Sequence, residues 1–139
     1  MFNLNPTSIF PMVLERYELE FEFLGLDSCY GYLERIKSPL TIERISRKLT
    51  PSFRASGRFY FGGKDYFMIP VDIKKGLEHP IEEVEEGDLV YEPNSDSIFI
   101  CLKAGKISMK VTPLGKITEN LEAAKKLQKY SPVTVKLRK

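Results

Sequence analysis

Hydrophobic and polar residues alternate most regularly over residues 17–23, where tyrosine, leucine and phenylalanine are separated by three glutamates. A period of two places successive side chains on opposite faces of an extended chain, so this segment predicts a strand with one buried face. Shorter apolar segments bounded by turn residues predict further strands at 29–36, 58–61, 66–69, 89–92, 98–102, 106–111, 114–117 and 133–137. The paired glycines within 62–65 supply the positive φ of a hairpin turn.

Two segments carry helical spacing instead. Ser38 and Pro39 suit the start of a helix, and apolar residues recur on one face until Pro51. Residues 119–130 form the second predicted helix, with lysines on the exposed face. An open sheet would leave edges exposed, and closure removes them. Some of the predicted strand segments are short, so they amount to about eight strands. The pattern therefore predicts a mainly β protein, a closed eight-stranded antiparallel barrel with two helices, in a domain at 17–139 that follows an N-terminal extension at 1–16.

Composition and charge narrow the possible partners. The 139 residues, 42% hydrophobic with a formal net charge of +2, fit one folded domain without a strong electrostatic field. We therefore expect no nucleic-acid partner, and no apolar run approaches the ~20 residues that span a bilayer. The apolar extension lacks the basic start and unbroken core of a signal peptide, so we expect it to be retained in a cytoplasmic protein.

Residues that usually carry chemistry are sparse. Cys29 and Cys101 stand far apart in apolar surroundings and predict buried, reduced thiols. His79 is the single histidine and lies in a polar connection at 74–88, without the neighbouring cysteine or histidine of a metal set. We expect His79 in a surface loop, the acidic residues of 82–88 on a solvated face, and neither a metal site nor a cofactor.

Three segments, at 31–43, 66–68 and 114–121, resemble cyclophilins in sequence and in order along the chain. The segment 87–95, which reads Gly-Asp-Leu-Val-Tyr-Glu-Pro-Asn-Ser, is similar to a motif of small prokaryotic cyclophilin-like proteins that have no assigned activity. The resemblance covers roughly 17–137. It implies the same closed barrel and a groove on its surface.

In a cyclophilin, an arginine donates a hydrogen bond toward the prolyl nitrogen and so eases rotation about an amide whose barrier is about 18 to 20 kcal/mol. The resemblance places Arg58 near that position, and it matches Phe67 and Met68 to the aromatic and methionine residues of the groove. The groove glutamine falls at Ile98 and the histidine near Val111, and the chain has no tryptophan. Alternation adds that Phe67 and Met68 should face opposite sides of a regular strand.

Tyr91, Glu92 and Phe99 complete the candidate site. The first two stand where the prokaryotic family has its most distinctive residues, although a strand that ends at the Pro93 turn would also explain them. We expect a binding module for a peptide or small molecule that lacks most isomerase groove residues. The alternatives are a weak peptidyl-prolyl isomerase and a homo-oligomeric interaction protein, a homodimer formed through the apolar extension.

Overall fold

The computed structural model describes residues 15–138, so residues 1–14 of the predicted extension, and the dimer contact assigned to them, lie outside the described residues. Arg16, predicted as the end of the extension, already belongs to the first strand. The helices are α1 (Pro39–Lys48) and α2 (Leu121–Lys125), with 3₁₀ turns η2 (Arg35–Lys37) and η3 (Tyr60–Gly62). The strands are β1 (Arg16–Phe23), β2 (Cys29–Glu34), β3 (Ser52–Phe59), β4 (Tyr66–Pro70), β5 (Ile81–Val84), β6 (Asp88–Glu92), β7 (Ser97–Cys101), β8 (Gly105–Glu119) and β9 (Tyr130–Leu137).

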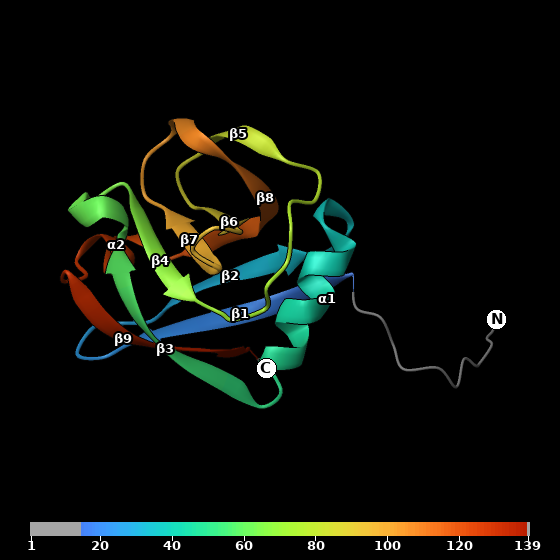
Figure 1. The fold of residues 1–139 in the computed structure, drawn as a ribbon. Coiled ribbons are helices and arrows are strands. Elements are labelled where there is room, and N and C mark those ends of the chain that lie inside the picture. The colour runs from blue at the N-terminus through green and yellow to red at the C-terminus, as the bar shows by residue number, and fades with distance from the viewer. Residues whose placement is uncertain (1–14, 139) are drawn as a thin grey trace.

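Eight strands close into an antiparallel barrel (Figure 1). Their order is β2-β1-β9-β3-β4-β7-β6-β8, and β8 pairs back with β2 to complete the ring. The last strand lies beside the first, with Phe21 opposite Val135. The predicted barrel with two helices is therefore confirmed. A ninth strand, β5, pairs with β8 outside the ring, in a stretch that the acidic composition of 74–88 predicted as an exposed connection.

The seam between β2 and β8 depends on two glycines. Gly31 lies opposite Ile117, and Gly115 lies opposite Leu33. A Cβ atom on Gly31 would stand 2.3 Å from the carbonyl oxygen of Lys116, and one on Gly115 would stand 1.9 Å from the carbonyl oxygen of Tyr32. The two backbones approach so closely that only residues without a Cβ fit there.

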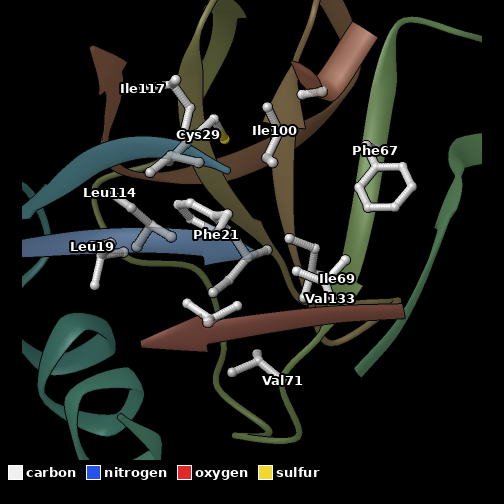
Figure 2. Packing of buried hydrophobic residues seen from close by; sticks show 14 of the residues in the cluster. Leu19, Phe21, Cys29, Phe67, Ile69, Val71, Ile100, Leu114, Ile117 and Val133 are labelled. Atoms are coloured by element: carbon white, nitrogen blue, oxygen red, sulfur yellow. The ribbon is translucent and has the colours of Figure 1, made fainter. Parts of the chain in front are cut away.

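Side chains from alternate strand positions fill the barrel interior. They form one hydrophobic cluster, the interior cluster, and Figure 2 shows Leu19, Phe21 and Ile100 among its side chains. Apolar residues of both helices and of the turns that follow them join the same cluster, namely Ile42, Ile45 and Leu49 for α1 and Ala123, Ala124 and Leu127 for α2. Cys29 belongs to it as well, and burial raises the pKa of its thiol to about 12. Both cysteines are buried and unpaired, as predicted.

Strand pairing changes three of the predicted elements. The second helix is shorter than 119–130, because Tyr130 pairs with Arg58 and starts β9. The segments 106–111 and 114–117 belong to one bent strand, β8, which pairs with β5 and β6 and then with β2. Residues 52–57, not predicted as a strand, extend β3 along β9.

The turn between β3 and β4 also departs from the sequence prediction. Gly63 has a φ of −77°, whereas Phe61 takes the left-handed conformation with a φ of 50° and a ψ of 31°. An aromatic residue rarely adopts this backbone region. The positive φ of the turn is thus supplied by Phe61, and the exposed ring of Phe61 projects from the barrel surface.

A crossing segment, residues 71–80, runs past α1 on its way from β4 to β5 (Figure 1). Its Glu78 carboxylate accepts hydrogen bonds from the backbone N–H groups of Leu40 (3.1 Å) and Thr41 (2.8 Å) and from the Thr41 hydroxyl (2.8 Å). Ser38 stands at the predicted N-cap position, but its hydroxyl donates to the carbonyl oxygen of Pro113 (2.7 Å). Glu78 therefore caps α1 from a distant part of the chain.

Replacement of Glu78 by alanine is expected to lower the free energy of unfolding by about 1–2 kcal/mol, as for loss of a helix cap. Burial acts to raise the pKa of Glu78, but the hydrogen bonds from Thr41 and Leu40 outweigh it, and the pKa lies below its ordinary value of 4.5. A depressed folded-state pKa means that this stabilisation is present above about pH 4.5 and is lost as the pH falls through the folded-state pKa.

Urea unfolding, carried out at a series of pH values above and below about pH 4.5, measures the free energy of unfolding that is lost in Glu78→Ala. Glu83→Ala is the matched control, because Glu83 is an exposed glutamate on β5. An equal loss of stability in both variants, or a loss in Glu78→Ala that persists unchanged at low pH, would contradict the capping role.

Candidate functional site

Strand register places three of the six predicted site residues in one row on the outer face of the barrel. Arg58 of β3 lies opposite Met68 of β4, and Met68 lies opposite Phe99 of β7. Tyr130 of β9 lies opposite Arg58 on its other side. Residues directly opposite each other in a sheet point to the same face, so these side chains are neighbours.

Phe67 and Tyr91 lie on the inner face. Both are fully buried in the interior cluster, and Figure 2 shows Phe67 there. The structure therefore does not bring them together with Arg58 and Met68 at the surface. The period of two already separated Phe67 from Met68, and the same alternation along β6 separates Tyr91 from Glu92.

A surface hollow of about 450 Å³ lies at this outer row. A second hollow of about 310 Å³ adjoins it and shares Arg58, Met68, Ser95 and Tyr130. We call the two together the groove. Its lining comes from β3, β4, β6, β7, β8, β9, η3, the turn between β6 and β7, and the residue before β9. It comprises Ser56, Arg58, Phe59, Tyr60, Phe61, Met68, Pro70, Glu92, Asn94, Ser95, Ser97, Met109, Lys129 and Tyr130.

The floor of the groove rests on a second hydrophobic cluster outside the barrel. Met68 of β4 and Phe99 and Cys101 of β7 belong to it, together with residues of β5, β6 and β8. The ring centroids of Tyr60 and Tyr66 lie 5.4 Å and 6.0 Å from that of Phe99. Phe99 is fully buried by this packing, so it supports the floor without reaching the surface.

The two charged residues predicted for the site differ in how they are held. The Glu92 side chain is buried, and its two carboxylate oxygens accept hydrogen bonds from the backbone N–H groups of Asn94 (2.7 Å) and Ser95 (2.8 Å). It thereby fixes the turn between β6 and β7. Arg58 is exposed, and none of the ion pairs formed within residues 15–138 includes it. Its guanidinium is available to a bound group.

The groove also contains exposed aromatic and basic residues that the sequence did not reveal. Tyr130 keeps 59% of its surface exposed and Phe61 90%. The Lys129 ammonium lies 5.6 Å from the centre of the Tyr130 ring, and the rings of Tyr60 and Phe61 stand 4.3 Å apart. Alternation from Arg58 predicts the face of Tyr60. Lys129 and Tyr130 could not be found in this way, because their segment was predicted as helix.

Two positions that would carry polar groove residues in a cyclophilin are apolar and buried. Ile98 lies in the barrel interior, and Val111 lies in the second hydrophobic cluster.

His79 is exposed, and its Nδ1 lies 2.6 Å from the carbonyl oxygen of Lys37. Within residues 15–138, no three histidine, cysteine, aspartate or glutamate side chains are grouped to hold a metal ion. None of the helices in the part of the chain that the structure describes combines the length and the hydrophobicity that a bilayer-spanning helix needs.

Comparison with known proteins identifies the fold and no family. No family model and no curated protein matches the chain in sequence. Among solved structures, the hypothetical protein AF2241 from Archaeoglobus fulgidus superposes with a TM-score of 0.69 at 19% identity, over 89% of this chain and 96% of that one. McbB, solved in complex with tryptophan, gives a TM-score of 0.68 at 10% identity, over 85% of this chain and 44% of McbB. At these identities, the likeness shows a shared barrel fold.

Proposed function

We propose that this chain is a non-catalytic binding module that takes a peptide or small molecule in the groove. The observation that carries the proposal is the outer row in which Arg58 lies beside Met68 and Tyr130. Small binding sites combine an apolar floor with a few polar groups that orient the ligand. The groove has this composition, with a methionine and aromatic floor and one exposed arginine.

The fold neighbour McbB offers independent support, because its structure was solved with tryptophan bound. A barrel of this shape can therefore belong to a protein that binds a small aromatic molecule. The chain spans less than half of McbB. From that protein we therefore infer for this chain only that it has a site for a small ligand.

Weak prolyl isomerase activity is the second candidate, favoured by the adjacency of Arg58 and Met68. Against it, Phe67 faces the barrel interior, and Ile98 and Val111 offer no hydrogen-bonding side chain. A groove that lacks most of the polar and aromatic partners of the arginine is better suited to binding than to amide rotation. We therefore place isomerase activity second.

Amide NMR spectra of the full chain, recorded while short proline-containing and aromatic peptides are added, test the proposal. We expect shifts to concentrate at Arg58, Met68 and Tyr130, and to be lost in Arg58→Ala. A protease-coupled assay on a proline peptide is expected to show no turnover. Shifts confined to the separate hollow around Leu24 and Arg54 would overturn the assigned site.

The assay also separates the two candidates. Clear turnover that Arg58→Ala abolishes would establish the isomerase and overturn the non-catalytic module. Turnover that survives Arg58→Ala would contradict the role of the arginine in either function.

A further inference from the structure

We propose that the preferred ligand of the groove is a small organic anion with an aromatic body, namely a carboxylate that carries an aromatic ring on a short chain. This inference rests on the proposed binding function and specifies its ligand class. It follows from the arrangement of charge at the groove and from the side chains that form its floor.

Two cations flank one exposed ring. Arg58 lies opposite Tyr130 in the sheet, and Lys129 precedes Tyr130 with its ammonium 5.6 Å from the ring centre. Both cationic side chains line the same hollow. A guanidinium presents paired N–H donors that match the two oxygens of a carboxylate, and a nearby ammonium adds a second positive charge.

The acidic lining residue, Glu92, offsets only part of this charge, because the lining holds two cations and one carboxylate. Glu92 is 3% exposed, and two backbone N–H groups already bind its oxygens. Arg58 and Lys129 take no part in the ion pairs formed within the described chain. The accessible charge of the groove is therefore positive, which favours an anion over a cation.

The floor indicates the uncharged part of the ligand. Met68 and Met109 contribute thioether groups, and Tyr60, Phe61 and Tyr130 contribute rings. Thioethers and aromatic edges pack favourably against aromatic ligands. A hollow of about 450 Å³ is also within the size range of small-molecule sites. Together, the floor and the cations fit a compact aromatic acid.

Three probes of the same shape test the charge preference in the full chain. They are 3-phenylpropionate, 3-phenylpropanol and 3-phenylpropylamine, which carry a negative, neutral and positive end group on one body. NMR titration is expected to show shifts at the groove with 3-phenylpropionate, and at least about tenfold weaker binding of the amine, as for loss of a charge-assisted hydrogen bond. Affinity for the anion should fall between about 0.01 M and 1 M salt, because salt screens exposed charges.

Arg58→Gln and Lys129→Gln are each expected to lower the affinity of the groove for 3-phenylpropionate by about fivefold or more. The affinity for 3-phenylpropanol should stay nearly unchanged. Arg54→Gln is the matched control, because Arg54 is an exposed arginine of the same strand that lines the other hollow. It should leave binding of all three probes unchanged.

The outcomes separate this inference from the proposed function. If the three probes bind the groove equally, or if only proline peptides bind there, the binding module stands and the anion preference is overturned. If Arg54→Gln and Arg58→Gln lower the affinity for 3-phenylpropionate equally, the preference reflects the overall charge of the protein, and the inference fails. If neither the probes nor the peptides shift the groove, both proposals fail.

Discussion

Gly115→Ala is expected to lower the free energy of unfolding by about 3–5 kcal/mol, a large share of the about 5–15 kcal/mol that holds a domain of this size. The new methyl group would stand 1.9 Å from the carbonyl oxygen of Tyr32, at the seam where β8 meets β2. Because the obstructing atom belongs to the backbone, no side-chain rotation relieves the clash. The two strands must separate, and the barrel loses one of its closing pairings.

Urea unfolding measures the loss, and amide hydrogen exchange locates it. We expect faster exchange in β2 and β8, with β3 and β4 changed less. Gly76→Ala is the matched control, because a Cβ on Gly76 would meet no atom within 4 Å, and its expected change is within about 0.5 kcal/mol. Similar stability of Gly115→Ala and the control would mean that the seam does not require close backbone contact.

Asp96→Ala is expected to lower the free energy of unfolding by about 3 kcal/mol through loss of a partly buried hydrogen-bond network. One carboxylate oxygen of Asp96 accepts the Tyr91 hydroxyl (2.5 Å) and the backbone N–H groups of Ile73 (3.0 Å) and Lys74 (3.1 Å). The change leaves the hydroxyl of the fully buried Tyr91 without its acceptor and releases the crossing segment. Asp96 also has a φ of 52°, which alanine tolerates poorly.

The loss should depend on pH. Burial acts to raise the pKa of Asp96, but hydrogen bonds from Tyr91, Lys74 and Ile73 outweigh it and hold the pKa below its ordinary value of 3.8. The stabilisation is therefore present above about pH 3.8 and is lost as the pH falls through the folded-state pKa.

Two companion variants separate the contributions to this network. Asp96→Asn keeps an acceptor and tolerates positive φ, so it is expected to cost about 1 kcal/mol and to remove the pH dependence. Tyr91→Phe keeps the buried ring and is expected to cost about 1 kcal/mol. Thermal and urea unfolding from pH 3 to pH 7 measure all three variants. Equal stability of Asp96→Ala and the parent protein at pH 7 would refute the role of the network.

Local sequence pattern was sufficient for the barrel and insufficient for some of its elements. The alternation over 17–23 and the helical spacing of Ile42, Ile45 and Leu49 depend on residues close in the chain, and both formed as predicted. Leu40, which the same spacing placed on the buried stripe, is 61% exposed. Lys129 and Tyr130 also fit a helical spacing, yet pairing with β3 placed Tyr130 in a strand. Likewise, β5 forms because β8 offers it an edge, which no pattern within 74–88 can show.

For the candidate site, too, the sequence predicted some residues correctly, whereas the placement of others depended on the tertiary structure. Resemblance selected Arg58 and Met68, and register placed them side by side. The resemblance also selected Phe67 and Tyr91, but strand alternation places both of these side chains in the barrel interior. Identity of residue type along a strand does not specify which face a side chain occupies, whereas the pleat does.

By itself, the sequence determined that this chain forms a closed β-barrel with two helices and buried thiols, because strand alternation, helix starts and apolar content act over neighbouring residues. Only the tertiary structure decided which residues share the outer row, that Glu78 rather than Ser38 caps α1, and that Lys129 and Tyr130 join Arg58 at the groove. These contacts join segments dozens of residues apart. Their geometry is set by strand register and barrel closure, which depend on the whole chain.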